Sequence, residues 1–435
     1  MDNPDDICDP KHICADDDRI DTWSVDWSSD KSLYNWYESL DLICEPSWKV
    51  SMISFSSFIA SLVTLPWAPR LADVYGRKPV LIGANLGHLV AYTMIMLSKS
   101  LDVIIAAVCI YGAISAIITS SGYLYLLELV PKKNETRVAS ILWILDQTTY
   151  LLPVLYFWFI SKHWFWIVLV GYCFQIVGLV SCFILPESPA FYLSLNRFEE
   201  TIKSFKIIAK VNGAKDFEQE IEPLKEEAAL IAATEVKATT ETPPLSYFFG
   251  QKTILLNFIL MAFIWLISTS NYYIILYLLN TFDQVYLCAT ASSLSEMLAY
   301  LVTGYIFEFL GPKKSYSVSF GMAFVGGIVL LFVGLKHQES WTFVLMVILA
   351  KFGIVATQGI NYMAHPDMFP TLFSTTSMGY IFIVMYTYAS LSNFVTTLEE
   401  PIPLIIFTAS SGLAAVLPIF LRLHKEKDGK VEEKS

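Results

Sequence analysis

The stretch Asp73-Val74-Tyr75-Gly76-Arg77-Lys78 joins two long apolar runs, and Glu308-Phe309-Leu310-Gly311-Pro312-Lys313 repeats its pattern in the second half of the chain. In each copy an acid ends one hydrophobic segment, a glycine follows three residues later, and cations precede the next segment. Glycine suits such a tight turn because it lacks a Cβ atom. The repeat indicates a duplicated membrane protein with two parallel halves, an arrangement found in many secondary transporters.

The composition supports a membrane protein. Of the 435 residues, 55% are hydrophobic and 16% are charged, and the mean hydropathy is +0.52. A helix needs about 20 apolar residues to cross a bilayer, and eleven stretches of the chain qualify. We expect these spans at residues 49–72, 79–98, 102–130, 138–161, 164–185, 252–280, 287–310, 315–335, 341–363, 375–397 and 402–422.

The spans divide the chain into two bundles with polar segments around them. Lysine and arginine are retained on the cytoplasmic side in short loops, and this rule places the two repeated loops and the C-terminus inside. We therefore expect an acidic exoplasmic segment at 1–48, an N-terminal bundle at 49–185, a cytoplasmic linker with short helices at 186–250, a C-terminal bundle at 251–423 and a cytoplasmic tail at 424–435.

The segment before the first span is strongly acidic, with 13 Asp and Glu residues against 3 Lys and Arg residues. It can raise the local concentration of cations, or it can be a solvated ectodomain whose charge is screened by salt. Cys8, Cys14 and Cys44 all lie in it. Three cysteines in an oxidising compartment leave one unpaired or paired to another residue.

The first loop carries a family resemblance, because Asp73-x-x-Gly76-Arg77-Lys78 resembles the signature loop of the major facilitator superfamily. Three further stretches resemble its organic cation/anion transporter branch: Pro186-Glu187-Ser188-Pro189, Asp41-Leu42-Ile43-Cys44 with Trp48, and Asp367-Met368-Phe369-Pro370-Thr371 with Gly379. Ser270-Asn271-Tyr272-Tyr273 and Lys351-Phe352-Gly353-Ile354 are similar to the seventh and tenth helices of that branch.

The resemblance implies an all-α membrane protein with the major facilitator fold, built from two pseudo-symmetric helical bundles. That fold has twelve spans, whereas about eleven are visible here. The family's first helix precedes a large exoplasmic loop, and this chain resembles the family from inside that loop onward. Two interpretations stay open, a truncated sequence or an atypical protein.

Family members close their cytoplasmic side with pairs of acids and arginines. The resemblance places this gate at Asp73, Gly76, Arg77, Lys78, Glu128, Arg137, Glu308, Gly311, Lys313 and Asp367. We call these acid and arginine pairs latches. Three departures from the family pattern predict that the latches of this chain are weakened. Pro69 and Ser374 replace an expected glycine and arginine, and Glu135 replaces the arginine expected after Glu128, a role that Arg137 could fill.

Ionisable groups inside a membrane are costly, so each is a candidate functional residue. Lys351 either contacts an anionic substrate or coupling carboxylate, or it forms an interhelical ion pair or snorkels toward the interface. Glu296 is expected to be structural and paired across helices, and Asp146 to serve either a hydrogen bond or proton coupling. Aromatic faces can hold organic cations, although most tyrosines should serve packing. The expected substrate-binding residues are Trp265, Asn271, Tyr272, Tyr273, Lys351 and Tyr386, the last standing where related carriers place a charge.

The predicted function is secondary transport of small amphipathic organic solutes by alternating access between the two bundles. The alternative is a non-transporting membrane receptor or scaffold that retains the fold. Nucleotide-binding loops, metal-ligand spacings and hydrolase motifs were not found, so we expect no enzyme activity, cofactor or metal. The expected partners are an organic solute, a coupling ion and the lipid bilayer, without nucleic acid, and the expected form is a monomer in the plasma membrane.

Overall fold

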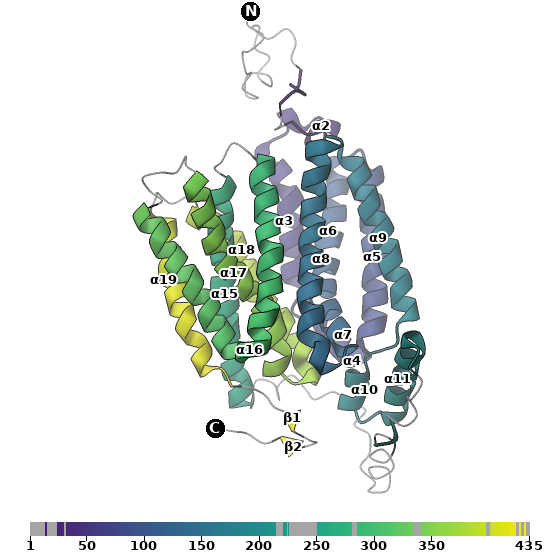
Figure 1. The fold of residues 1–435 in the computed structure, drawn as a ribbon. Helices are drawn as coiled ribbons and strands as arrows, with labels where there is room; N and C mark the ends of the chain where they lie inside the picture. The colour runs from purple at the N-terminus through teal and green to yellow at the C-terminus, as the bar shows by residue number, and fades with distance from the viewer. Residues whose placement is uncertain are drawn as a thin grey trace, which may run out of the picture.

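The computed structural model describes residues 14, 24–29, 32–214, 221–223, 225, 250–280, 285–333, 341–396, 401–422, 426–427 and 430–431. Within these residues the chain forms a bundle of long helices that run in roughly the same direction, some in front of others (Figure 1). Cys8, half of the acidic segment, much of the predicted linker and most of the tail lie outside the described residues.

The first bundle contains five of the predicted spans, of which one is a bent pair of helices and another includes a π-helical turn. Its elements are α3 (Ser47–Thr64), α4 (Ala68–Tyr75), α5 (Arg77–Leu97), α6 (Leu101–Ile117), η2 (Ile118–Gly122), α7 (Tyr123–Glu128), α8 (Lys132–Phe159) and α9 (Trp164–Ile184). Helices α3 and α4 meet at a bend of 45°. Helices α6 and α7 are continuous through η2, a single π-helical turn, and such turns are frequent at functional sites.

The second bundle contains the other six predicted spans. Its elements are α15 (Lys252–Asn280), α16 (Val285–Val333), α17 (Trp341–Met368), α18 (Thr371–Thr396), α19 (Ile402–Val416) and η4 (Leu417–Phe420). Helix α16 is two helices that meet at Gly311, whose backbone is not helical. We call residues 285–310 its first limb and residues 312–333 its second limb.

Helix is therefore present in each of the eleven predicted ranges. By length and hydropathy alone, the described residues contain eight helices able to cross a membrane, or nine with the bent α3 and α4 pair. In this number α16 counts as one helix, although its two limbs correspond to two predicted spans. The number also leaves out α18, which is rich in serine, threonine and tyrosine.

The pattern of burial is that of a protein surrounded by lipid. No residue of α9 is buried, and this apolar helix exposes Phe174, Val177 and Val180 on the outside of the first bundle. By contrast, 78% of the residues in the apolar window of α17 are buried. Apolar side chains can face outward in this way because the bilayer, unlike water, solvates them.

Short elements cap the two ends of the bundles. Helix α2 (Trp36–Ser39) and η1 (Leu42–Cys44) lie at one end, whereas α10 (Pro189–Ser194), α11 (Phe198–Asn212), β1 (Glu426–Lys427) and β2 (Lys430–Val431) lie at the other (Figure 1). We refer to the first end as exoplasmic and the second as cytoplasmic, following the distribution of lysine and arginine.

The exoplasmic segment is tied to the loop between α8 and α9. The Lys162 ammonium donates hydrogen bonds to the carbonyl oxygens of Trp27 and Ser29, each 2.6 Å long. Tyr34 exchanges backbone hydrogen bonds with Lys162 and Trp164. Cys14 forms a disulfide with Cys44, which answers part of the pairing question left open by the sequence.

Candidate functional site

The first repeated loop brings three charged side chains together at the cytoplasmic end. Arg77 is completely buried and forms ion pairs with Asp73 at 3.2 Å and with Glu128 at 3.1 Å. Its guanidinium also lies over the ring of Phe191, 4.8 Å from the ring centre. Buried charges are stable only when they are paired and hydrogen-bonded, and these contacts meet that need.

The same cluster connects the two bundles. The Asp73 carboxylate accepts hydrogen bonds from the backbone N–H and the hydroxyl of Thr376 in α18, at 2.8 and 2.6 Å. Arg77 donates to the backbone carbonyl of Thr371 at 3.0 Å. Backbone and hydroxyl groups of α18 thus partner the charges at this point, and the weakening expected from Glu135 and Ser374 stays a prediction.

A close helix contact lies beside this cluster. Gly379 of α18 faces α4 so closely that a Cβ atom there would lie 2.5 Å from Cγ of Pro69. Pro69, which departs from the expected glycine, is thus part of the contact. The two bundles are packed together at this point as well as hydrogen-bonded.

Glu187 holds the turn between α4 and α5. Gly76 has a φ of 103°, which favours glycine, and Glu187 accepts hydrogen bonds from the backbone N–H groups of Arg77 and Lys78 at 2.9 and 3.1 Å. Burial raises the pKa of Glu187, whereas these N–H groups, that of Ser188 and the Arg77 charge act in the opposite direction. The Lys78 ammonium instead donates to the carbonyl oxygens of Phe183 and Leu185 at the end of α9.

The remaining predicted gate residues have other partners. Arg137 pairs with Glu308 at 3.4 Å, so it does not take the role at Glu128 that the sequence suggested. This pair joins α8 to α16, but Arg137 is 71% exposed, and exposed pairs contribute little stability.

The other three predicted gate residues lie elsewhere on the cytoplasmic side. Gly311 has a φ of 71°, as the repeated turn predicts. Lys313 donates to the carbonyl of Ile419 at the outer surface, and Asp367 lies within electrostatic range of Lys132.

A second charged cluster lies inside the second bundle, about halfway along the helices. The Lys351 ammonium in α17 is fully buried and forms an ion pair with Glu296 in the first limb of α16. Lys351 also donates a hydrogen bond to Ser292 and lies over the ring of Tyr272, 5.2 Å from its centre. The Tyr272 hydroxyl donates to Glu296 at 3.3 Å. The interhelical ion pair, one of the two interpretations of Lys351, is present.

An aromatic cluster closes the space between the bundles on the cytoplasmic side of this pair. The Tyr362 ring lies 4.1 Å from Trp143 of the first bundle and 4.6 Å from Trp265 of the second. Tyr123 of the first bundle also contacts Tyr362. Trp265 is fully buried, and its indole N–H has no hydrogen-bond partner in the described part of the chain. Sequence reasoning missed Trp143 and Tyr123, because nothing in their spacing shows that they reach the other bundle.

Three other predicted binding residues lie in different surroundings. Asn271 was expected to bind substrate, but its side chain is bonded elsewhere. Its amide donates to Phe407 and Ser411 and accepts from Ser410, so it fastens α15 to α19 rather than facing the Lys351 cluster. Tyr273 packs edge-on against Tyr272. Tyr386 contacts Phe58 of the first bundle and lies within electrostatic range of Tyr273 and Tyr150. Asp146 lies within the same range of Glu296.

No set of three or more histidine, cysteine, aspartate or glutamate side chains suited to a metal ion occurs among the described residues. The arrangement combines a paired charge cluster with aromatic rings between two helical bundles. Such a site can bind a small solute through charge and ring contacts, but it offers no activated nucleophile.

A family model described as Major Facilitator Superfamily matches residues 41–393. The human organic cation/carnitine transporter 2 is 21% identical over 419 residues, which cover 92% of this chain and 71% of that protein. Bovine solute carrier family 22 member 1 is 25% identical over 353 residues, covering 78% and 58%. The beta-alanine transporter of Drosophila melanogaster is 24% identical over 376 residues, covering 82% and 59%. The chain thus spans 58–71% of the length of these three relatives.

Solved structures show the same fold. The proton:xylose symporter XylE bound to a bromodeoxyglucose superimposes with a TM-score of 0.64 at 12% identity, covering 87% of both chains. A bacterial homologue of the iron transporter ferroportin, in an outward-facing state, gives 0.59 at 14% identity and covers 87% of this chain and 92% of its own. The predicted all-helical fold of two bundles is confirmed.

Proposed function

Because this chain belongs to the Major Facilitator Superfamily and resembles its organic cation transporter branch, we propose that it is a secondary carrier of small amphipathic organic solutes. It is an integral, multi-pass membrane protein, and its relatives are transporters rather than enzymes. We place it in the plasma membrane as a monomer that uses a solute or ion gradient. The scaffold alternative is less favoured, since the relatives are named as carriers.

The observation that carries the proposal is the buried Lys351 and Glu296 pair. Ionisable groups at this depth are expensive and mark substrate or ion pathways in membrane proteins. Tyr272 contacts both members of the pair. We therefore place substrate binding at Lys351, Glu296 and Tyr272, with Tyr273, Tyr386 and Trp265 supplying aromatic surface.

The chemistry of the pair favours a zwitterionic solute. The carboxylate of such a substrate can pair with Lys351 while its ammonium group pairs with Glu296. When the substrate separates the two residues, neither is then left without a partner of opposite charge. Two of the relatives are named for carnitine and beta-alanine, which both carry a cationic nitrogen and a carboxylate. Tyrosine rings beside the pair would contact the cationic end.

We propose that alternating access proceeds by rocking the two bundles about this site. The contacts of Asp73 and Arg77 with α18, the packing of Gly379 on Pro69 and the aromatic cluster around Tyr362 all join the bundles on the cytoplasmic side. These contacts support a cytoplasm-closed state of the carrier. Gly76, Glu128, Arg137, Glu308 and Asp367 complete the proposed gate, with Lys78, Gly311 and Lys313 shaping its turns.

The test is uptake into vesicles that contain the purified full chain. Labelled cationic, anionic, zwitterionic and neutral solutes are compared, together with Tyr273→Ala and the matched control Tyr305→Ala, which alters an exposed tyrosine of α16. We expect saturable uptake, strongest for a zwitterion, that falls with Tyr273→Ala and not with Tyr305→Ala. Absence of uptake for all four classes, with the protein correctly folded and inserted, would reject a carrier.

A further inference from the structure

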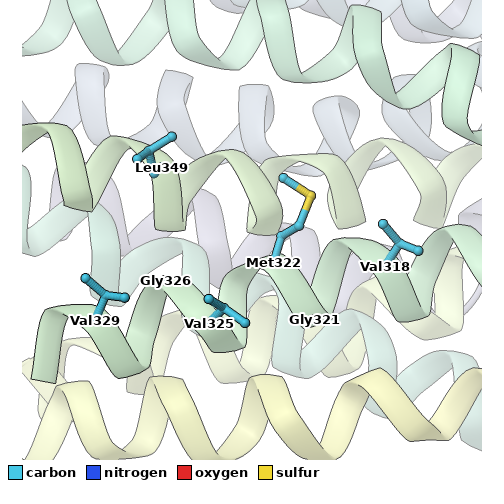
Figure 2. Close-up of a pocket in the computed structure, with 7 residues that line it drawn as sticks. All are labelled: Val318, Gly321, Met322, Val325, Gly326, Val329 and Leu349. Carbon is cyan, nitrogen blue, oxygen red and sulfur yellow. The ribbon is translucent and has the colours of Figure 1, made fainter.

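An apolar groove runs along the outer face of the second limb of α16. The groove has a volume of about 530 Å³, and its walls include Val318, Met322, Val325 and Val329. Figure 2 shows these side chains along one helix, with Leu349 reaching in from the neighbouring α17. Gly321 adds depth, because no atom lies within 4 Å of the position that its Cβ would take.

A second hollow continues the groove toward the cytoplasmic end. It has a volume of about 490 Å³ and shares Val318 with the first. Its walls include Lys313 and Lys314, together with Ser317 of the same helix face and Ile419 of η4. The surface thus changes along one helix from a purely apolar groove to a hollow that carries two ammonium groups.

The dimensions of this surface match one leaflet of a bilayer. At a rise of about 1.5 Å per residue, the helix extends about 16 Å from Val318 to Val329. The hydrocarbon core of a bilayer is about 30 Å thick, so one leaflet contributes about 15 Å. The lysines then lie at the level of the lipid headgroups on the cytoplasmic side.

The two repeated loops differ in whether a described carboxylate accepts hydrogen bonds from the backbone N–H groups that follow the glycine. In the first loop, the Glu187 carboxylate accepts hydrogen bonds from the backbone N–H groups of the two residues that follow Gly76. In the second loop, no described side chain accepts from the N–H groups of Lys313 or Lys314, and the space beside Gly311 is open. Among the residues that the structure describes, the second copy retains the cations but has no carboxylate in the corresponding place.

We propose that this surface binds one anionic phospholipid of the cytoplasmic leaflet. Its phosphate group contacts Lys313 and Lys314, and one acyl chain occupies the groove from Val318 to Val329. Charge complementarity selects the headgroup, since anionic lipids attract basic residues at the membrane surface. The apolar groove selects a molecule with a long hydrocarbon chain, which a soluble phosphate compound lacks.

Native mass spectrometry of the full chain, released from detergent, tests the proposal. The probes are phosphatidylserine and phosphatidylcholine with identical acyl chains, and glycerophosphoserine as the headgroup without chains. We expect phosphatidylserine to bind with one strong site, and about tenfold more tightly than phosphatidylcholine. Equal binding of the two lipids, or equally tight binding of glycerophosphoserine, would overturn the proposal.

Variants separate the headgroup site from the groove. Lys313→Gln with Lys314→Gln should reduce phosphatidylserine binding about tenfold, whereas Lys203→Gln with Lys210→Gln, on exposed α11, should not. Gly321→Leu should fill the groove and reduce binding of both lipids at the site, while Gly171→Leu, which also has open space around it, is the control. If Lys313→Arg with Lys314→Arg binds normally, loss in the glutamine variant reflects charge rather than misfolding. Undiminished binding in both the glutamine and the Gly321→Leu variants would reject the site.

Discussion

The carboxylate of Asp73, in the first bundle, accepts both the backbone N–H and the hydroxyl of Thr376, in the second. Because hydrogen bonds to charged groups contribute about 1.5–3 kcal/mol, we expect this contact to stabilise the proposed cytoplasm-closed state. Both groups are buried, so the contact cannot open without exposing an ion-paired carboxylate.

Replacing the Thr376 hydroxyl should favour cytoplasmic opening. Thr376→Val keeps the backbone donor and the side-chain volume but removes one hydrogen bond, which should shift the equilibrium by about 1–3 kcal/mol. Distances between spin labels on the cytoplasmic ends of α8 and α17 should lengthen in a larger fraction of molecules. Thr387→Val is the control, because the Thr387 hydroxyl donates to the Ile383 carbonyl within α18. An unchanged distance distribution in Thr376→Val would show that the hydroxyl does not hold the gate.

Gly379→Ala should separate the bundles by steric contact instead. The added methyl group would meet Pro69, and overpacking of this kind typically costs about 1–3 kcal/mol. The expected result is a lower melting temperature together with greater labelling of cytoplasmic positions. Gly171→Ala, where a Cβ meets no atom within 4 Å, should change neither. Equal effects of the two substitutions would show that the loss of stability does not arise from contact with α4.

The Lys351 and Glu296 pair should behave as a unit. Removing one partner leaves a buried charge and should destabilise the protein by about 3–5 kcal/mol. We therefore expect Lys351→Met and Glu296→Gln to be less stable singly than the double variant in thermal unfolding. All three should lose uptake of zwitterionic solutes. A double variant that is destabilised by the sum of the single changes would show that the two residues are not coupled.

Trp143→Ala should open the aromatic cluster. The Trp143 ring contacts Tyr362, Tyr300 and Tyr123, and its loss removes packing on both bundles. We expect higher accessibility of the Lys351 region from the cytoplasmic side, measured as faster modification of a cysteine at position 357. Trp166→Ala, which removes an exposed tryptophan of α9, is the control. Identical modification rates would place the barrier elsewhere.

The fold could be predicted from the sequence because its signals are local. Runs of apolar residues, and the glycine of a loop such as the one at Gly76, can be recognised from neighbours in the chain, even though the distant Glu187 also holds that turn. The family model supports the same conclusion over residues 41–393. The positive φ values of Gly76 and Gly311 confirm the predicted turns.

The site was less predictable because its contacts join distant helices. Lys351 and Glu296 were both recognised by their cost in a membrane, and a pairing across helices was expected for each, but nothing in their spacing showed that they pair with one another. Asn271 stood beside the correct tyrosines in sequence, yet the helix turns its amide toward α19. Trp143 carried no signal, since a tryptophan in an apolar span has many possible neighbours. Thr376 could not be identified because its partner Asp73 lies in the other bundle.

The use of a main-chain donor at Thr376 affects how this gate tolerates mutation. Every amino acid except proline supplies a backbone N–H, so half of the contact with Asp73 persists whichever residue stands at position 376. Sequence drift at that position would then tune the strength of closure in small steps rather than abolish it. Asp73 has no such tolerance, because only its own carboxylate accepts both donors. In related chains, the position of Thr376 should consequently vary more than the position of Asp73.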